Sequence, residues 1–396
     1  MEDIVQSNKI TLNEAPEVTK HAGFQRQVIG EFADRCSIHP GCLEPVWPLS
    51  LPACYPATMA KVRAFIEADP ALRDYPEPLF SRNCGRSAIV AAEMLGDDSH
   101  LTDEQLERKA AFHLMMTVDI VQTWFLDDAL DENLTDPLYG SALANLDADM
   151  IEGDPADLPE RVAAIRANSS QQGIPRAYID ALLSLCRWRR SLLLEVGIPL
   201  RSSSLFVKVR RCFLDSLLRI HEPFHTWQAY ESHRSYNSGT HVLIVSSTYW
   251  NCYQWQIDPS PMERDQERFL SILFRYGGLG GLSNDLFGYE KDVVEGVATA
   301  VDVAKRTLLG GVGDDEQLTH AAFARVCDIH NERLNELVRR AETCGDPLEA
   351  AMLYSGLRAA WALRALHQEY SGIYHAGWLA RSLQARAMEL PLVRSA

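Results

Sequence analysis

The segment PLEAAMLYSGLRAAWALRALHQEY, residues 347–370, has apolar residues three and four positions apart along its whole length. Because an α-helix turns every 3.6 residues, this spacing predicts a helix with one buried apolar face. The same spacing recurs in YIDALLSLCRWRRSLLLEV (178–196), LFVKVRRCFLDSLLRI (205–220) and HAAFARVCDIHNERLNELVRRAE (320–342). An alternating pattern typical of β-strands does not recur. The sequence therefore predicts an all-α fold, a bundle of roughly ten or more helices.

The N-terminal segment differs from the rest of the chain. CSIHPGCLEPVWPLSLPACYP, residues 36–56, contains five prolines, and each proline limits helix formation. We therefore expect an irregular N-terminal strap over residues 1–57 and a single α-helical domain over residues 58–396. The expected breaks between helices are short, namely LTDPLYG (134–140), the acidic segment DADMIEGDPADLP (147–159) and GGVGDDEQ (310–317).

Three polar or glycine-rich segments have simple structural interpretations. Asp147, Asp149 and Asp154 are expected in a solvated acidic loop, and CRWRR (186–190) on an exposed helix face, with a basic contact patch as the alternative. RYGGLGGL, residues 275–282, lacks the lysine and hydroxyl residue that follow a phosphate-binding loop. Its glycines predict instead a close approach between two helices, or a kink.

Charge and composition limit the classes of partner. The formal net charge of −16 at pH 7 disfavours nucleic acid and anionic membrane surfaces, because both recruit basic patches. A small anionic substrate is not disfavoured, since a bound cation reverses the local field. Nine cysteines without a CxxC pair predict reduced thiols. A polar N-terminus and the lack of a long apolar run predict a cytoplasmic protein without stable membrane insertion.

Acidic residues gather in WFLDDALDEN, residues 124–133, directly after a run of bulky apolar residues. Helical residues four positions apart share one face, so Asp127 lies over Asp131 and Asp128 lies over Glu132. Like charges at this spacing repel, which indicates a balancing cation, and carboxylate oxygens suit a hard divalent ion. The alternative is a solvated acidic helix end, although acids oppose the helix dipole there.

A second polar group lies in NDLFGYEKD, residues 284–292. Asn284, Gly288 and Asp292 are four positions apart, so one helix face carries an amide oxygen, a gap and a carboxylate in a row. The gap has room for a water ligand, and the neighbouring Lys291 is placed to reach an anion held by the metal. On its own this pattern is common on solvated helices.

Together, DDALDE (127–132) and NDLFGYEKD resemble the paired metal motifs, DDxxD/E and NDxxSxxxE, of class I terpene synthases of the fungal and bacterial type. The order, the wide separation and the helical context are similar over residues 58–390. The resemblance implies a helical bundle around a central apolar cavity, and Mg²⁺ as cofactor, with three ions in the family and Mn²⁺ as a substitute. The implied metal ligands are Asp127, Asp128, Asp131, Asn284 and Asp292. Gly288 stands where the family has Ser or Thr, and Asp292 stands for its Glu.

The resemblance extends to YESHRSYNSG, residues 230–239, which is similar to the family's Y-x-x-x-R-R-x-x-x-G segment. It implies that Arg234 senses the substrate diphosphate, with Ser235 in place of the second arginine. Ser238 and Gly239 fall where the family's helix break presents a carbonyl group to the substrate.

The C-terminal segment GWLARSLQARA, residues 377–387, resembles the family's Arg-Tyr region. Arg386 is the expected diphosphate contact, although Ala387 replaces the tyrosine and Arg381 is a competing choice. Arg234, Lys291 and Arg386 would then stabilise the charge of the leaving diphosphate.

A carbocation needs an apolar cavity that excludes water, and aromatic faces stabilise it. The candidate lining residues are bulky aromatics, each with ordinary core packing as the alternative: Phe112, Trp124, Phe125, Trp250, Tyr374 and Trp378.

With the resemblance, these residues predict a Mg²⁺-dependent terpene cyclase, a carbon–oxygen lyase that ionises a linear isoprenyl diphosphate. Farnesyl diphosphate is the expected substrate, cyclised to a sesquiterpene with release of diphosphate. The alternatives are a C20 diterpene cyclase, an isoprenyl chain-elongating transferase and a non-catalytic helical binding protein with a decayed site. A transferase usually carries a second DDxxD, where this chain has NDLFGYEKD. The sequence leaves the product and the pairing of two copies as a homodimer open.

Overall fold

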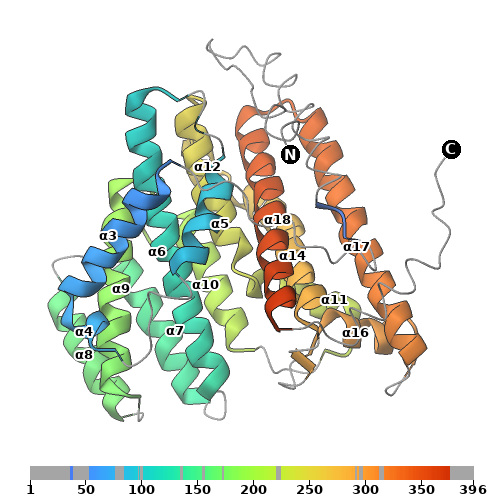
Figure 1. The fold of residues 1–396 in the computed structure, drawn as a ribbon, viewed down its shortest axis with the longest axis horizontal. Helices are drawn as coiled ribbons and strands as arrows, with labels where there is room; N and C mark the ends of the chain where they lie inside the picture. The colour runs from blue at the N-terminus through green and yellow to red at the C-terminus, as the bar shows by residue number, and fades with distance from the viewer. Residues whose placement is uncertain are drawn as a thin grey trace.

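The computed structural model describes residues 36–38, 53–75, 84–96, 98, 101–133, 137–153, 157–171, 174–219, 224–289, 292–293, 298–311 and 316–374. At positions 128–133, 137–140, 158, 168–171, 365 and 368–374 it describes only the backbone. All regular structure in these ranges is helical, which confirms the predicted all-α fold (Figure 1). The helices are α3 (Tyr55–Ala68), α4 (Pro70–Arg73), α5 (Gly85–Leu95), α6 (Asp103–Asn133), α7 (Pro137–Glu152), α8 (Leu158–Gln171), α9 (Arg176–Glu195), α10 (Leu205–Leu217), α11 (Trp227–Asn237), α12 (Thr240–Gln254), α13 (Ser260–Arg264), α14 (Gln266–Phe287), α16 (Ala300–Thr307), α17 (Glu316–Thr343) and α18 (Pro347–Tyr374).

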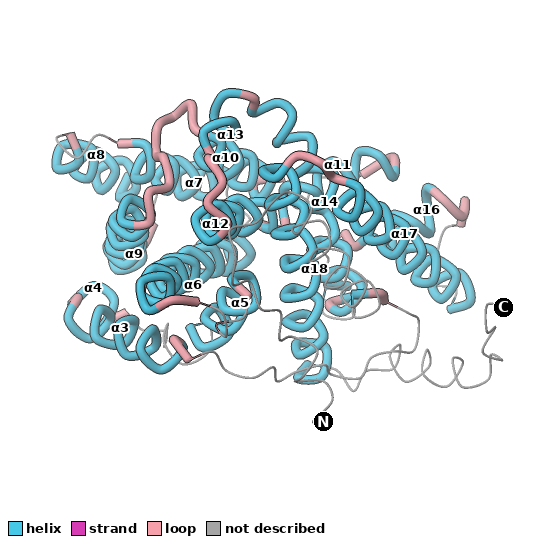
Figure 2. Tube along the Cα trace, turned by 90° about the horizontal axis from the view of Figure 1, so that it is seen from above, coloured by secondary structure: helices cyan, strands magenta, loops and turns pink. Residues whose placement is uncertain are grey.

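Helix α12 lies at the centre of the bundle. Every residue from Thr240 to Cys252 is buried, as in a helix covered on all sides. Helices α5, α6, α10, α14 and α18 pack around it, and Figure 2 shows α12 among its neighbours. Helices α3, α4, α7, α8 and α9 lie outside α6, whereas α16 and α17 lie outside α14.

Contacts at both ends of α12 show that α6 runs antiparallel to it. Phe112, in the first half of α6, packs on Trp250 near the end of α12, with ring centroids 5.7 Å apart. Thr123, eleven residues later in α6, lies beside Gly239, directly before α12 begins. The C-terminal end of α6 therefore points to the end of the bundle where α12 starts.

Helix α18 also runs antiparallel to α12. Thr248, in the second half of α12, hydrogen-bonds Ser355 in the first half of α18, with the two hydroxyl oxygens 3.2 Å apart. Thr240, at the start of α12, and Leu363, further along α18, both lie against Gly280 of α14.

Helix α14 runs parallel to α18. Arg268 binds Glu349 near the start of both helices, and Ser283 hydrogen-bonds His367 nearer their ends, at 2.8 Å. Helices α6, α14 and α18 are therefore parallel to one another, and their C-terminal ends lie at the same end of the bundle.

The glycines of RYGGLGGL allow α11 to approach α14 closely. A Cβ atom added to Gly281 would lie 2.8 Å from Cγ of Arg234 and 3.0 Å from its carbonyl oxygen. A Cβ atom added to Gly277 would lie 3.3 Å from the carbonyl oxygen of Ser235. The predicted close approach between two helices is confirmed.

The prediction of a solvated acidic loop is wrong for Asp147, and for Asp149 only the loop is wrong, because its side chain is 52% exposed. Helix α7 continues to Glu152, so both residues are helical, and Asp147 is fully buried. Two buried arginines, Arg189 and Arg210, neutralise Asp147, which removes the reason for it to face water. Asp154 lies outside the described residues.

The prediction that CRWRR forms an exposed face is wrong for Arg189, which is fully buried on α9. Its guanidinium group pairs with Asp119 and Asp147 across the α6, α7 and α9 junction. A guanidinium group is buried in proteins only with such partners. A local sequence pattern does not reveal them.

The predicted N-terminal strap lies mostly outside the described residues. Helix α3 begins at Tyr55, within the last residues of the predicted strap. In the short described segment 36–38, the backbone N–H of Ile38 donates to Oδ1 of Asn331 at 2.9 Å, and Nδ2 of Asn331 donates back to the Ile38 carbonyl at 2.8 Å. This segment is therefore held against α17.

Two further predictions concern the whole chain. The cysteines at described positions are free thiols, as predicted. Among the helices of the described ranges, none has both the length and the apolar character that a membrane crossing requires.

Candidate active site

The junction between α11 and α12 lies close to the C-terminal halves of α6 and α14. Gly239 has a φ of 63° in the left-handed region, which suits glycine because it has no Cβ atom. The hydroxyl group of Ser238 donates to the Gly277 carbonyl of α14 at 3.2 Å. On the other side, a Cβ atom added to Gly239 would lie 3.7 Å from Cγ2 of Thr123 on α6. The helix break is at the predicted position, and its role toward a substrate stays a prediction.

Arg234 connects this junction to the second acidic motif. Its Nε donates to Oδ1 of Asp285 at 2.8 Å, and its guanidinium group also hydrogen-bonds Asn237. Asp285 in turn accepts the backbone N–H of Ala300, at the start of α16, at 2.7 Å. The Arg234 side chain is 12% exposed. Its position is set by Asn237 of α11 and Asp285 of α14 together.

Asn284, Gly288 and Asp292 share one face, as the spacing predicted. The backbone N–H of Gly288 donates to the Asn284 carbonyl, and that of Asp292 donates to the Gly288 carbonyl at 3.0 Å. A Cβ atom added to Gly288 would lie 3.4 Å from Oδ2 of Asp292. The Asp292 carboxylate therefore lies beside the position that a side chain on residue 288 would occupy. An amide oxygen and a carboxylate on either side of a glycine are donors that fit a hard cation such as Mg²⁺.

Asp127 lies on α6 one turn beyond Thr123, at the same end of the bundle as Asn284. Helix α6 continues to Asn133, so the helical spacing of Asp127 and Asp131 is confirmed. The side chains of Asp128 and Asp131 lie outside the described residues, and Lys291 does so entirely. Among the side chains that are described, no group of three or more His, Cys, Asp or Glu is arranged to hold a metal ion. The predicted ligand set stays a prediction.

The sequence matches no family profile and no curated protein, but solved structures match the fold. 2-Methylisoborneol synthase from Streptomyces coelicolor A3(2), in complex with Mg²⁺ and 2-fluorogeranyl diphosphate, superimposes with a TM-score of 0.59 at 14% identity, over 87% of this chain and 98% of that chain. Its complex with Mg²⁺ and geranyl-S-thiolodiphosphate gives 0.58 at 15% identity, over 84% and 98%. A variant of cucumene synthase gives 0.53 at 16% identity, over 84% and 100%. This chain has the fold of class I terpene synthases.

Within this terpene synthase fold, Ser283 and His367 form a partly buried pair beside the second motif that was not predicted from the sequence. Ser283, the residue before Asn284, donates its hydroxyl to the Gly280 carbonyl at 2.9 Å. Its oxygen therefore accepts from Nδ1 of His367 on α18, at 2.8 Å. Burial and the nearby Arg234 lower the pKa of His367 to about 3, so this imidazole is neutral near pH 7. The only sequence signal is that His367 lies on the periodic face of α18.

The predicted aromatic residues differ in their described contacts. Trp250 is fully buried, donates Nε1–H to the Leu95 carbonyl at 2.9 Å, and packs on the buried Phe112. Phe125 stacks on Tyr178 of α9, with ring centroids 4.6 Å apart. These contacts are those of core packing, the alternative that the sequence left open. A role for these residues in a substrate cavity stays a prediction, as does the central apolar cavity of the terpene synthase fold.

The remaining predicted residues are less defined. Trp124 is partly buried and packs against the main core. Tyr374 is the last residue of α18, described by its backbone only. Trp378, Arg381 and Arg386 lie outside the described residues. Helix α18 ends at the same end of the bundle as α6 and α14. Its last residue, Tyr374, therefore lies at the end of the bundle that carries this candidate site.

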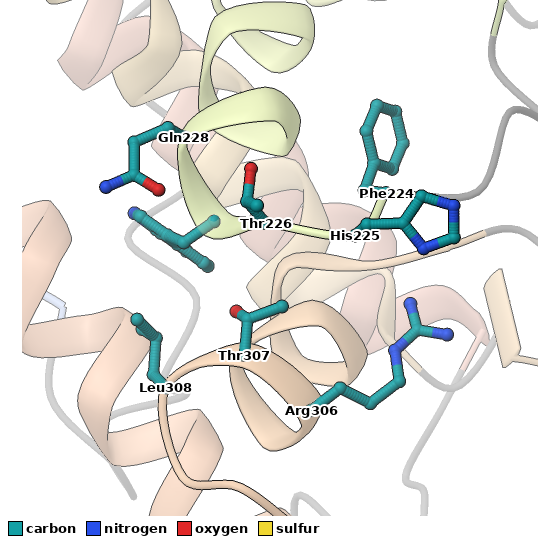
Figure 3. A pocket seen from close by; sticks show the side chains of 8 residues that line it. Phe224, His225, Thr226, Gln228, Arg306, Thr307 and Leu308 are labelled. Atoms are coloured by element: carbon teal, nitrogen blue, oxygen red, sulfur yellow. The ribbon is translucent and has the colours of Figure 1, made fainter.

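A cavity of about 470 Å³ lies elsewhere, between the N-terminal end of α11 and the C-terminal end of α16 (Figure 3). Its lining residues are Phe224, His225, Thr226, Trp227, Gln228, Arg306, Thr307 and Leu308. None of the predicted site residues lines it. It is therefore separate from the helix ends that carry the acidic motifs.

Proposed function

We propose that the protein is a Mg²⁺-dependent terpene cyclase that ionises a linear isoprenyl diphosphate and cyclises the resulting carbocation. One observation carries the proposal. Helices α6, α14 and α18 are parallel, so DDALDE and NDLFGYEKD, far apart in sequence, end at the same end of the bundle. Arg234, near the α11–α12 junction, hydrogen-bonds Asp285 of the second motif. Neither motif alone distinguishes a metal site from a solvated helix end.

The proposed ionisation breaks the bond between the allylic carbon and the diphosphate oxygen. The electron pair leaves with the diphosphate, and the carbon chain becomes an allylic cation. Bound Mg²⁺ supplies charge neutralisation on the leaving oxygens. The residues proposed to hold it are Asp127, Asp128 and Asp131 from α6, with Asn284 from the last turn of α14 and Asp292 from the segment that follows α14.

Cationic side chains of this chain bind the diphosphate directly in this proposal. Arg234 is oriented by Asp285 and Asn237, so its guanidinium group needs little reorganisation when an anion arrives. Lys291 and Arg386 are the proposed additional contacts. The carbonyl group at the Ser238–Gly239 break faces the carbon chain, and the aromatic candidates exclude water from the cation.

The substrate class has support from the solved relative with the higher TM-score, which binds Mg²⁺ and two geranyl diphosphate analogues. For this chain we propose farnesyl diphosphate as the substrate, because the chain length and the family resemblance favour a C15 substrate over a C20 one. The test is incubation of the purified protein with Mg²⁺ and geranyl, farnesyl or geranylgeranyl diphosphate alone, followed by mass spectrometry of the extracted products. A cyclic hydrocarbon or alcohol from farnesyl diphosphate is the expected result.

The same experiment separates the alternatives. A cyclic product only from geranylgeranyl diphosphate indicates a diterpene cyclase. Turnover only after addition of isopentenyl diphosphate indicates a chain-elongating transferase. No turnover of any substrate, with no heat of binding for Mg²⁺ and inorganic diphosphate in calorimetry, refutes an enzymatic function and leaves the helical binding protein.

A further inference from the structure

A group of charged side chains is buried where α6, α7, α9 and α10 meet. Asp119, Asp147, Arg189 and Arg210 are each at most 1% exposed. The two carboxylates and the two guanidinium groups balance one another in charge. The proposed ionisation uses none of these four residues.

Arg210 of α10 connects three helices with its single guanidinium group. Its Nε donates to Oδ2 of Asp147 on α7 at 3.0 Å. Its other two nitrogens reach consecutive residues of α6, with Nη2 donating to Oε1 of Gln122 at 2.9 Å and Nη1 donating to Oγ1 of Thr123 at 2.7 Å. Arg189 of α9 supports Asp147 from the other side, at 3.2 Å.

Stability alone does not account for this group. Buried ion pairs lose much of their attraction to the cost of removing charges from water, and apolar replacements are often neutral or stabilising. The charge of Asp147 is nonetheless maintained: burial would raise the pKa of Asp147, but Arg189 and Arg210 hold it at about 2. Burial raises the pKa of Asp119, so Asp147 is the carboxylate that pairs firmly with the two arginines. In some proteins, polar groups of this kind are retained because they specify one arrangement of helices.

The arrangement specified here is that of α6 relative to the α11–α12 junction. Thr123 lies one helical turn before Asp127, and its methyl group lies 3.7 Å from the position of a Cβ atom on Gly239. Arg210 also lies over the ring of Phe213, at 4.9 Å. That ring contacts the same position on Gly239 at 3.4 Å. Arg210 therefore touches two of the side chains that enclose the helix break.

We propose that Arg210, held by Asp147, is a positioning residue that fixes the rotation of α6 so that Asp127 faces the Ser238–Gly239 break. The inference rests on the proposed function. Two consecutive α6 residues point about 100° apart around the helix axis, so hydrogen bonds to both Gln122 and Thr123 prevent rotation in either direction.

The geometry indicates that small rotations matter. Side-chain atoms lie about 5–6 Å from a helix axis, so a rotation of about 20° moves a carboxylate by about 2 Å. Mg²⁺ requires near-ideal octahedral geometry with oxygen ligands at about 2.1 Å. Loss of the hydrogen bonds from Arg210 to α6 would therefore weaken Mg²⁺ binding without unfolding the helix.

The test compares two threonine-to-valine changes. Thr123→Val removes a hydroxyl that donates to the Asp119 carbonyl at 2.7 Å and accepts from Arg210. Thr248→Val is the matched control, because the Thr248 hydroxyl also has two partners, the Ile244 carbonyl and Ser355, but lies towards the far end of α12. Thr123→Ser keeps the hydroxyl and tests rescue.

The measurement is the rise in melting temperature caused by MgCl₂ with inorganic diphosphate, as a function of Mg²⁺ concentration. Turnover of the substrate, as kcat and KM, is measured on the same samples. We expect both valine variants to melt at lower temperature without ligands. Thr123→Val should need about tenfold more Mg²⁺ for half its maximal effect, with a lower kcat and little change in KM. Thr248→Val and Thr123→Ser should keep the wild-type Mg²⁺ requirement.

Two outcomes overturn the inference in distinguishable ways. If wild-type protein responds to Mg²⁺ with diphosphate but Thr123→Val needs no more Mg²⁺ than Thr248→Val, Arg210 has only a structural role. If the wild-type protein neither responds to Mg²⁺ and diphosphate nor turns over any isoprenyl diphosphate, the proposed function fails, and the positioning role fails with it.

Discussion

Replacing Gly281 with alanine is a direct test of how α14 and α11 pack. The added Cβ atom would lie 2.8 Å from Cγ of Arg234 and 3.0 Å from its carbonyl oxygen. The carbonyl belongs to the backbone of α11, so it moves only with that helix. The Arg234 side chain is also restrained, because its Nε is bound to Asp285.

Two opposing effects set the magnitude. Alanine is favoured over glycine in a helix by about 1 kcal/mol. Overpacking a well-packed contact costs about 1–3 kcal/mol. Because one of the two short contacts is to backbone, we expect overpacking to win and the free energy of unfolding to fall by up to about 2 kcal/mol.

Gly356 of α18 provides the matched control. A Cβ atom added there would lie 3.6 Å from Cδ2 of Leu337, an ordinary contact. Gly356→Ala should therefore raise the free energy of unfolding by about 0.5–1 kcal/mol. The two substitutions are chemically identical, so helix propensity cancels in the comparison, and the expected difference of about 1–3 kcal/mol reports packing.

The assay is urea unfolding followed by circular dichroism for wild-type protein and both variants. Thermal stabilisation by MgCl₂ and inorganic diphosphate is measured in parallel, because displacement of Arg234 should also weaken the response to diphosphate. If Gly281→Ala is as stable as Gly356→Ala, α11 does not approach α14 as closely as described, and the reasoning is refuted.

Four further substitutions have defined outcomes. Asp127→Ala and Asn284→Ala should each reduce turnover strongly while circular dichroism stays unchanged, and full activity of either variant would show that the proposed metal ligands are wrong. Gly288→Ser adds a hydroxyl beside the Asp292 carboxylate, and its Cβ atom would lie 2.9 Å from the Asn284 carbonyl oxygen, so the free energy of unfolding should also fall. The Mg²⁺ concentration for half-maximal activity should decrease about three- to tenfold, which corresponds to about 1 kcal/mol of binding free energy; an unchanged requirement indicates that water already serves as the ligand. His241 is fully buried, neither ring nitrogen has a hydrogen-bond partner among the described residues, and burial lowers its pKa to about 3. The unfolded chain, with an ordinary histidine pKa of about 6.5, therefore binds more protons than the folded protein between about pH 6.5 and 3, and stability falls as the pH decreases through that window. His241→Phe should reduce the loss of stability between pH 7.5 and 5.5 by about 1.4 kcal/mol, measured by urea unfolding at both pH values, and an equal loss in both proteins would contradict burial of this imidazole.

Much of the candidate site was predictable because its signals are local. Residues four apart on a helix share a face in any fold, so the alignment of Asn284, Gly288 and Asp292 followed from spacing alone. Glycines in RYGGLGGL predicted a close helix contact because only a missing Cβ atom permits one. The break at Gly239 followed from the resemblance to a family segment.

The wrong predictions concern charge. Asp147 and Arg189 were expected in solvent because each lies in a polar stretch of sequence. The structure buries both, since α6, α9 and α10 bring partners that share their charges. His367 was missed for a related reason, because its partner Ser283 lies on another helix.

The sequence by itself determined the helical fold class and the faces on which the acidic motifs lie, because helix periodicity is a property of neighbouring residues. Only the tertiary structure decided that α6, α14 and α18 run parallel and bring their motifs to one end of the bundle. It also decided which charges are buried. Helix direction and burial depend on contacts between segments far apart in the chain, and no local pattern contains that information.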